Sequence, residues 1–402
     1  MKTPHLAPAL PAILILVAVL IGGAFYTQSV AQRDIHALAS SKLSLNITGS
    51  VLQKIAIQQP DLLLIYGSSE MIYQSNTYGA SEVFSNYPTG FAPFVVAYNG
   101  MTSLITAQDV ASLGPDLHGK KVVISFTPSM FHALMADKTA YVGLFSRLHA
   151  NELAFSPDLS LETKQLAAQR MRQYPKTLKN DPVLNFALEK LADDSLPNRA
   201  LYYAIWPLGK LQTTVLELQD HWETLQTIEA QHSLDPAISR KPAAIDWSAL
   251  EIKVTEEQKA RTDNNPYGID NAFWGGLRDR FQQKAEAKEG QSFIGNMALS
   301  AEWTDLDILL RTLTELGARP LLLSRPINGS YWEALGVTEQ ARQTTYYARL
   351  QQLAQRYNAP IVDFQDHDND KYFNVDPSSH TSSLGWVYVD QTLDAFYHDL
   401  LH

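Results

Sequence analysis

Five short apolar runs, separated by longer polar stretches, constrain the fold of this chain more than any other feature of its sequence. They read LLLIY, FVVAY, VVISF, PLLLS and PIVDF, and they occupy residues Leu62–Tyr66, Phe94–Tyr98, Val122–Phe126, Pro320–Ser324 and Pro360–Phe364. A strand with one wet face alternates apolar and polar residues, whereas a parallel strand that is covered on both faces is continuously apolar. The sequence therefore predicts an α/β fold: a parallel sheet with flanking helices.

Amphipathic helices are predicted before the last two strands, as an α/β fold requires. In the stretch Thr304–Gly317, TDLDILLRTLTELG, Thr304 is a suitable N-cap and Asp307 holds the capping-box position. Gly317 supplies the left-handed residue that ends a helix. A second helix is expected at about Thr338–Tyr357, directly before the fifth strand. Both stretches predict the helix-to-strand step of an α/β fold.

The middle of the chain differs from its two ends. It is rich in Leu, Ala, Gln, Glu and Lys, and the stretches LETKQLAAQRMRQ and TVLELQDHWETLQTIEAQ have the periodicity of amphipathic helices. We interpret it as a mainly helical insertion between two parts of one α/β domain. The predicted boundaries are 58–131 for the first part, 132–291 for the insertion and 292–402 for the second part.

The N-terminal segment, residues 1–32, predicts a membrane anchor. No charged residue occurs between Lys2 and Arg33, and Leu10–Phe25 reads LPAILILVAVLIGGAF. About 17 helical residues span roughly 25 Å, slightly less than the thickness of a bilayer core. A cleaved signal peptide is the alternative, with a small-residue cleavage site at 29–31.

A neck at 33–57 is expected to connect this segment to the domain. Under either interpretation the remaining chain lies outside the cytoplasm. We predict a single-pass protein of the cell membrane with its catalytic domain on the extracytoplasmic side.

Composition excludes several classes of function. The formal net charge is −10 and the isoelectric point is about 5.6, which argues against a nucleic-acid-binding protein. The chain has no cysteine, so disulfides, thiolate catalysis and zinc–thiolate centres are excluded.

The first strand ends in the tetrapeptide Gly67-Ser68-Ser69-Glu70. In open α/β sheets, ligands bind at the carboxyl ends of the strands. A serine at this position can attack an acyl carbon while its own N–H helps to hold the oxyanion. The alternative is that the serine only caps a helix.

A serine nucleophile needs a base, and His380 is the candidate. It lies in YFNVDPSSHTSSLGW, a loop of small and turn-forming residues, with Asp376 four positions earlier. An aspartate can orient the imidazole while the other ring nitrogen faces the serine. A solvated loop histidine is the alternative. Four other histidines are predicted to lie at the surface: His118, His149, His221 and His232.

Several motifs together resemble a known family. The order of a serine after the first strand, a glycine after the second and an Asp–His pair near the C-terminus resembles the SGNH or GDSL hydrolases. More closely, the chain resembles the DltD family, in YGSSEM, NGMTSLI, GKKVVISFTPSMF, NPYGIDNAFW, SAEWTDLDILL, RPINGSYWEALG and DPSSHTSSLGWVYVD. These seven motifs occur in the same order as in that family.

The resemblance implies a set of site residues. Ser69 is the implied nucleophile, with Ser68 as the fallback. His380 is the implied base and Asp376 its orienting partner. Gly100, after the second strand, is implied to offer an N–H to the oxyanion beside that of Ser69.

The chain departs from the family pattern at the Asp–His pair. The family spaces these residues as D-x-x-H, whereas here they read D-P-S-S-H, one residue longer. Asp363 and Asp366 are therefore alternatives to Asp376.

Glu70, Arg325 and Asn328 are further candidates for substrate binding. Arg325 and Asn328 follow the fourth strand, so the guanidinium could hold a polymer phosphate at the same edge of the sheet. Solvation in a loop is the alternative for both, and a place in the first turn of a helix is the alternative for Glu70. Trp332, in the same motif, is a fourth candidate.

The resemblance also implies a function. A D-alanyl group would arrive through a membrane acyltransferase of the MBOAT type and a D-alanyl carrier system, and Ser69 would pass it to teichoic acid or a related anionic polymer. No metal or cofactor is expected. A carboxylesterase or thioesterase, and a non-catalytic scaffold of the D-alanylation complex, are the two alternatives.

Overall fold

The computed structural model describes residues 9–40, 49–72, 78–132, 138–229, 244–377 and 380–401. At its centre is one five-stranded sheet, in which every paired strand is parallel and the order is β2-β1-β3-β4-β5. The strands are β1 (Leu62–Gly67), β2 (Ala92–Ala97), β3 (Lys121–Phe126), β4 (Arg319–Ser324) and β5 (Ile361–Val362). The predicted α/β class and all five predicted strands are thus confirmed, although β5 is shorter than expected.

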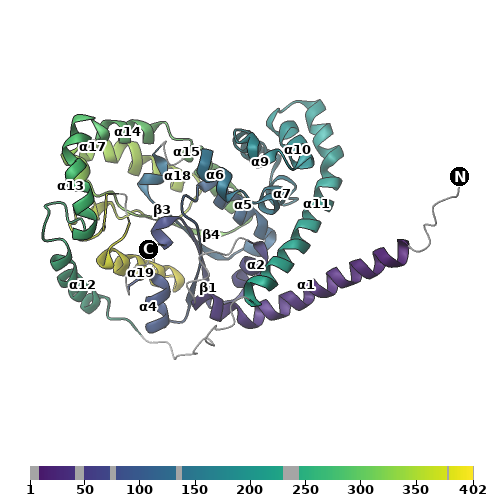
Figure 1. The fold of residues 1–402 in the computed structure, drawn as a ribbon, viewed down its shortest axis with the longest axis horizontal. Helices are drawn as coiled ribbons and strands as arrows, with labels where there is room; N and C mark the ends of the chain where they lie inside the picture. Colours follow the sequence, from purple (N-terminus) through teal and green to yellow (C-terminus); the bar gives the residue numbers. More distant parts are fainter. Residues whose placement is uncertain are drawn as a thin grey trace.

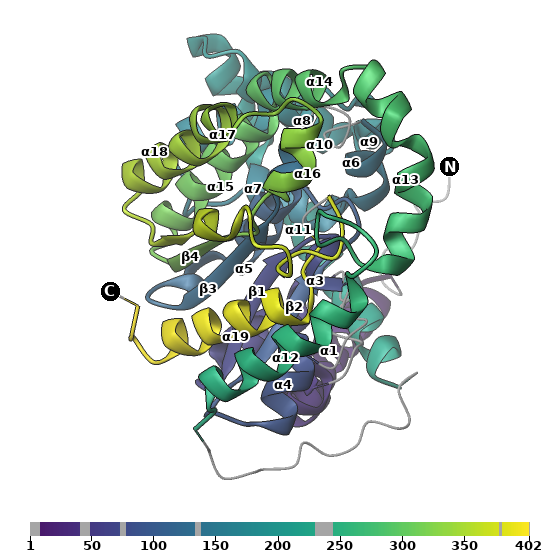
Figure 2. The same cartoon turned by 90° about the vertical axis from the view of Figure 1, so that its left-hand side faces the viewer.

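Helices cover both faces of this sheet. In β1, Leu62, Leu64 and Tyr66 belong to one apolar cluster, whereas Leu63 and Ile65 belong to another. The larger cluster joins the sheet to α2 (Ser50–Gln58), α5 (Ser103–Leu113) and α15 (Glu302–Glu315). The smaller one joins it to α4 (Ala80–Asn86) and α19 (Ser383–Tyr397), which lie together with α12 (Trp247–Arg261) in Figure 2. Burial on both faces is the reason that the strands lack alternation.

Between β3 and β4 the described residues form helices and no strand. These helices are α6 (Lys138–Leu144), α7 (Arg147–Ala154), α8 (Leu161–Met171), α9 (Pro175–Leu178), α10 (Pro182–Ala192), α11 (Leu196–Glu229), α12, α13 (Asn271–Glu286), α14 (Glu289–Ala298) and α15. Several of them share the larger apolar cluster with the sheet. The helical character of this region is as expected, and its boundaries as an insertion stay a prediction.

The last part of the chain carries β4, α16 (Gly329–Ala334), α17 (Glu339–Arg342), a π-helical turn at Gln343–Tyr347, α18 (Ala348–Arg356), β5 and α19. The predicted helix at 338–357 is therefore present but interrupted. The predicted start of the preceding helix at Thr304 is wrong, because α15 begins at Glu302. The Glu302 carboxylate accepts the backbone N–H of Ser103 at 2.6 Å, so a tertiary contact rather than a capping box fixes this end.

The N-terminal helix α1 (Ala9–Ser40) extends away from the domain in Figure 1. Its C-terminal part is packed, since Ala31, Ile35, Leu38 and Ala39 are buried, and it contacts α11 and β2. Among the residues that the structure describes, no helix was found long and apolar enough to cross a membrane. The anchor stays a prediction, and the predicted neck falls partly on residues outside the description.

Candidate active site

The turn after β1 brings two serines to the carboxyl end of the sheet. Gly67 ends the strand, and a Cβ on it would lie 2.3 Å from Met71 Cγ and 2.8 Å from Glu70 Oε1, so only glycine fits. Ser69 then begins the short helix α3 (Ser69–Ile72) and is half-buried, whereas Ser68 is buried. Of the two hydroxyls, that of Ser69 is thus the more accessible.

His380 and Asp376 lie beside Ser69. The distance between His380 Nε2 and Ser69 Oγ is 3.1 Å. On the other side of the ring, Nδ1–H donates to Asp376 Oδ2 at 2.6 Å. The predicted serine, histidine and aspartate therefore form one continuous hydrogen-bonded chain, the arrangement of a serine nucleophile, a base and an orienting carboxylate.

The longer Asp–His spacing is absorbed by a closed loop. The backbone N–H of Val375 donates to the carbonyl oxygen of His380 at 2.8 Å, and the N–H of His380 donates to Asp376 Oδ1 at 3.2 Å. Residues 378–379, which lie between the aspartate and the histidine, are outside the described residues. Of the alternatives, Asp363 accepts from Gln351 and from the backbone of Gln365, so its carboxylate is engaged away from this loop.

The environment of His380 favours a stronger base than an ordinary histidine. Burial alone lowers the pKa of His380, but the hydrogen bond and the charge of Asp376 outweigh burial, and the charge of Glu70 adds to them. The pKa of His380 is therefore raised, because the imidazolium is stabilised in this site.

Ser68 has a structural role in this arrangement. Its hydroxyl donates to the carbonyl of Tyr98 and accepts the N–H of Gly100, each at 3.1 Å. The hydroxyl thus joins the loop after β1 to the loop after β2. Gly100 has φ of +78°, a conformation that favours glycine. The N–H that sequence analysis assigned to the oxyanion is engaged by Ser68 in this structure.

Glu70 is a buried group and not a surface contact for substrate. Its side chain is 1% exposed, and its Oε1 accepts the backbone N–H of Ser68 at 2.9 Å. Burial raises the pKa of Glu70, although the Ser68 N–H and the charge of Arg325 oppose this. Glu70 therefore fixes the turn that carries the two serines.

The prediction that Arg325 contacts a polymer phosphate is wrong. Arg325 is fully buried, with its guanidinium 5.0 Å from the ring centre of Trp386. Burial lowers the pKa of Arg325 to about 10, and the charges of Glu70 and Asp390 oppose this shift. Burial also raises the pKa of Asp390 well above its usual range. The charges of Glu70 and Asp390 thus favour the charged form of a guanidinium that burial disfavours.

Trp332 braces the loop that carries His380, and Asn328 caps the helix on which Trp332 lies. Asn328 caps α16 by accepting the N–H of Tyr331 at 3.0 Å, so it is a helix cap and does not face the site as a free side chain. The indole N–H of Trp332 donates to the carbonyl of Pro377 at 3.0 Å, and its ring stacks on Phe293. In the sequence, only the place of Trp332 in its motif indicates a role for this residue.

The motif NPYGIDNAFW braces the same loop from a second side. Asn265 organises the turn by accepting the N–H groups of Tyr267 and Ile269, and the N–H of Asp270 donates to the carbonyl of Val375 at 3.0 Å. Gly268 has φ of +66°, and a Cβ on it would lie 1.5 Å from a backbone oxygen of the neighbouring segment. This motif therefore acts through the position of the loop.

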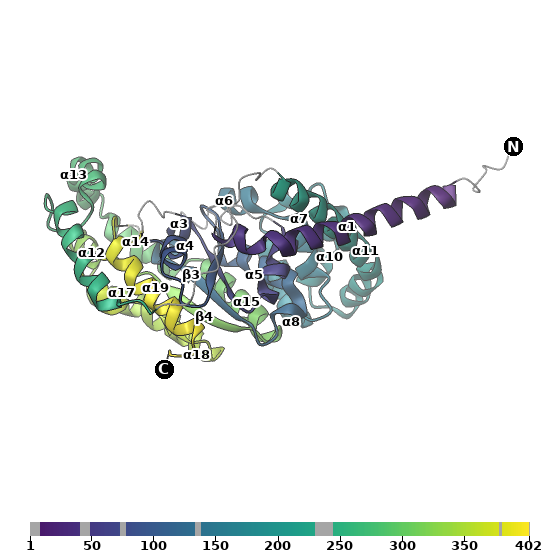
Figure 3. The same ribbon diagram turned by 90° about the horizontal axis from the view of Figure 1, so that it is seen from below.

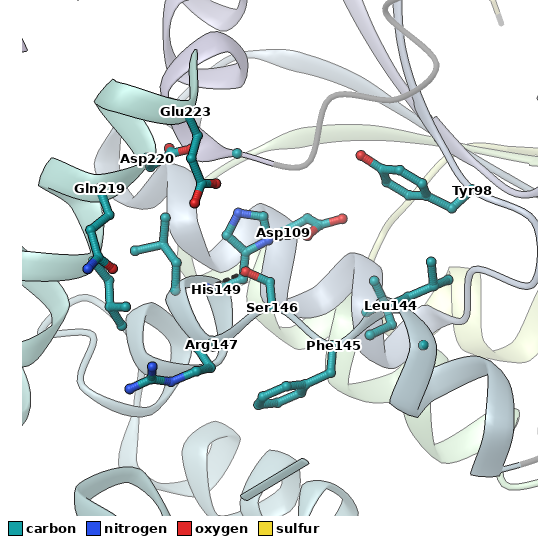
Figure 4. Close-up of a pocket in the computed structure, with 15 residues that line it drawn as sticks. Tyr98, Asp109, Leu144, Phe145, Ser146, Arg147, His149, Gln219, Asp220 and Glu223 are labelled. Carbon is teal, nitrogen blue, oxygen red and sulfur yellow. Dashed lines mark hydrogen bonds and ion pairs between the residues drawn. The ribbon is translucent and has the colours of Figure 1, made fainter. Parts of the chain in front are cut away.

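A second His–Asp pair lies at a cavity of about 460 Å³ (Figure 4). The prediction that His149 lies at the surface is wrong, since its side chain is 3% exposed and its Nδ1 pairs with Asp109. Within the described part of the chain, His149 Nε2 has no hydrogen-bond partner. Asp220, on the cavity wall, caps α2 by accepting the N–H groups of Ser50 and Val51. Ser146 lines the same cavity, but its hydroxyl accepts the backbone N–H of His149 and is not bonded to the imidazole.

No group of three or more potential metal ligands was found among the described residues. The arrangement at Ser69 fits nucleophilic chemistry with a neighbouring histidine as the base.

Comparison with known proteins points to one family. The model of a family described as DltD protein matches residues 40–398. A protein of Bacillus subtilis named Protein DltD is 26% identical over 399 residues, which cover 99% of this chain and 98% of the relative. Proteins of the same name from Staphylococcus aureus and Lacticaseibacillus rhamnosus are each 24% identical, over 96% and 97% of this chain and 95% and 90% of their own length.

Proposed function

The chain belongs to the DltD family, and from this premise we propose that it transfers a D-alanyl group to a teichoic acid or a related anionic polymer outside the cytoplasm. The observation that carries the proposal is the hydrogen-bonded chain from Ser69 through His380 to Asp376 at the carboxyl edge of the sheet. The five-stranded parallel sheet with helices on both faces supports an SGNH-like interpretation of the fold.

In the first half-reaction Ser69 takes up the acyl group. His380 Nε2 accepts the hydroxyl proton while Ser69 Oγ attacks the carbonyl carbon of an activated D-alanyl donor. The proton then passes from His380 to the leaving group, so that a D-alanyl ester of Ser69 remains. Asp376 accepts the Nδ1–H throughout and stabilises the imidazolium that forms between the two steps.

In the second half-reaction the polymer replaces the serine. His380 accepts a proton from an acceptor hydroxyl, whose oxygen attacks the ester carbon. Ser69 leaves and regains its proton from His380. The product carries an ammonium on a negatively charged polymer and so has a lower net negative charge.

The negative charge on the carbonyl oxygen needs N–H donors during both half-reactions. Ser69 and Gly100 are the proposed donors. In the structure the Gly100 N–H is bonded to Ser68 Oγ at 3.1 Å, so it must turn from this hydroxyl to the oxyanion when the acyl group is present. Ser68 would then keep its bond to the carbonyl of Tyr98.

The proposed location is the outer surface of the cell membrane, with α1 as a single-pass anchor. The uncharged stretch between Lys2 and Arg33 supports this location. The proposed partners are an MBOAT-type acyltransferase and a D-alanyl carrier system, which would supply the donor from the membrane.

The test is the content of base-labile D-alanine on the envelope polymer, measured in wild-type, deletion, Ser69→Ala and Ser68→Ala strains at matched protein levels. The proposal expects the ester to be lost in the deletion and in Ser69→Ala. In Ser68→Ala the link between the loops after β1 and β2 is lost but Ser69 is kept, so this strain is expected to retain a measurable part of the ester. Normal ester content in Ser69→Ala would instead identify the protein as a scaffold.

A further inference from the structure

The long helix α11 carries an apolar stripe on its solvent side. Its members recur at alternating steps of three and four residues, and we call them the outer stripe: Leu201, Ala204, Leu208, Leu211, Val215, Leu218, Trp222 and Leu225. Five large members are exposed: Leu201 by 44%, Leu208 by 47%, Leu211 by 62%, Val215 by 49% and Trp222 by 63%. Isolated apolar side chains at a surface are ordinary, but an unbroken helical stripe of large ones is not.

The outer stripe lies opposite the face by which α11 packs on the domain. The buried residues of the helix are Tyr202, Gly209, Thr213, Asp220, Thr224 and Ile228. At about 100° per residue, these project to the side opposite the outer stripe. Gly209 packs so closely on Phe155 that a Cβ would lie 2.2 Å from its ring. The fold is thus complete on the inner face without the outer stripe.

Charged side chains are absent from the outer stripe itself. Between Leu201 and Leu225, Lys210, Glu217 and Glu223 project to the flanks or the inner side, and Glu229, the last residue of the helix, follows Leu225 on the outer side. On a helix exposed to water, the side opposite the core is normally the polar one. Here the pattern is reversed, so the outer face is suited to an apolar surrounding along roughly 36 Å of helix.

The position of α11 indicates what that surrounding is. In Figures 1 and 3, α11 lies at the end of the domain toward which α1 extends. The two helices contact each other. Further along α1, toward its N-terminus, Val19 and Phe25 are 64% and 69% exposed. A bilayer that receives α1 therefore lies on the side of the domain where α11 is found.

We propose that α11 is a membrane-surface helix whose outer stripe inserts into the lipid interface. The inference rests on the proposed anchoring of α1, which sets the orientation, and goes beyond it by assigning a second lipid contact. A stripe of leucines with a tryptophan is the chemistry of helices that lie in the plane of a membrane. Because acidic residues flank the outer stripe, the contact depends on apolar burial and requires no anionic lipid. Two separate contacts hold the catalytic domain in one orientation above the bilayer.

The absence of cysteine makes a direct test possible. Single-cysteine variants of the full chain carry one fluorescent label each and are reconstituted into phosphatidylcholine vesicles with brominated acyl chains. Leu211→Cys and Val215→Cys report on the outer stripe. Thr214→Cys is the control on the same helix, Arg278→Cys is the control on α13 at the far end of the domain (Figure 1), and Val19→Cys reports on the anchor.

The expected result is quenching of the labels at Leu211 and Val215 by brominated lipid, several-fold above quenching at Thr214 and Arg278. The inference is overturned if the label at Val19 is quenched while those at Leu211 and Val215 stay as accessible to an aqueous quencher as that at Arg278. In that outcome the anchor stands and the lipid contact of α11 fails. If the outer-stripe labels are protected only in native membranes, the occupant is a membrane protein and the lipid assignment is likewise overturned. Lack of quenching at Val19 would instead refute the anchor.

Discussion

Replacing Asp376 by asparagine tests the proposed site without disturbing its shape. The substitution removes the carboxylate that accepts His380 Nδ1–H at 2.6 Å, in a pair whose side chains are only 22% and 11% exposed. A hydrogen bond to a charged group contributes roughly 1.5–3 kcal/mol, which corresponds to a rate lower by about 10- to 150-fold. We expect a loss of this size in any reaction of Ser69 that uses His380 as a base.

The pH dependence of the same reaction gives a second, independent readout. A general base acts in its neutral form, so the rate rises as His380 loses its proton. Asp376 raises the pKa of His380 against the effect of burial, so the rise in wild type lies at a higher pH than for an ordinary histidine. Without the carboxylate, burial lowers the pKa of His380, and the rise moves to lower pH while the plateau falls.

The assay is the rate at which a phosphonate serine probe labels Ser69 in the purified protein, measured across pH. It needs neither the donor nor the polymer. Asp363→Asn is the matched control, because Asp363 is the sequence-based alternative to Asp376 and is engaged elsewhere. If the plateau rate and the pH profile are unchanged in Asp376→Asn, the proposed role of the Asp376–His380 pair is refuted. An equal effect of Asp363→Asn would refute it as well.

Three further predictions concern the residues that hold the site. Trp332→Phe removes the indole N–H that braces the His380 loop. We expect the unfolding free energy, measured in urea, to fall by about 1–3 kcal/mol and the probe to label Ser69 more slowly. An unchanged labelling rate would contradict the bracing role. Gly268→Ala should lower the unfolding free energy by at least about 2 kcal/mol, because φ is positive at this position and the new Cβ would meet backbone atoms. Gly275→Ala is the control: it has open space around it and should be neutral or stabilising by roughly 0.5–1 kcal/mol. Equal effects of the two substitutions would refute the steric argument. Glu70→Gln and Arg325→Met should each destabilise the fold, since each removes one of two buried opposite charges that favour each other, and the double variant should lose less than their sum; strict additivity would show that the two charges are not coupled.

The sequence predicts the sheet and the main side chains of the site for a physical reason. Strands that are buried on both faces have continuously apolar sequences, and each of the five apolar runs overlaps a strand of the parallel sheet. Residues directly after parallel strands lie at one edge of the sheet, which places the serines after the first strand there, whereas Gly100 was assigned through the resemblance. Asp376 and His380 were assigned through the resemblance and their spacing, and the loop closed by Val375 shows how the longer spacing is accommodated.

What the sequence did not predict depends on partners that are distant along the chain. Arg325 follows a strand and is polar, so a solvent-facing role was expected, yet it is fully buried against Trp386. His149 sits in a helix with polar neighbours, and only Asp109, from another helix, explains its burial. A single sequence carries no signal for such pairs, because burial of a charge is decided by tertiary compensation.

The most direct test of the central claim is mass spectrometry of the peptide that contains Ser69. The protein is isolated as the full chain from cells that make the D-alanyl donor but lack the acceptor polymer, so that the acyl group cannot move on. The expected result is a D-alanyl ester on Ser69 that disappears under mild base and is absent from the Ser69→Ala and His380→Gln variants. Two results together would contradict the proposal that this serine carries the acyl group. Ser69 would be unmodified under these conditions, and a Ser69→Ala strain that has the polymer would form the normal amount of ester.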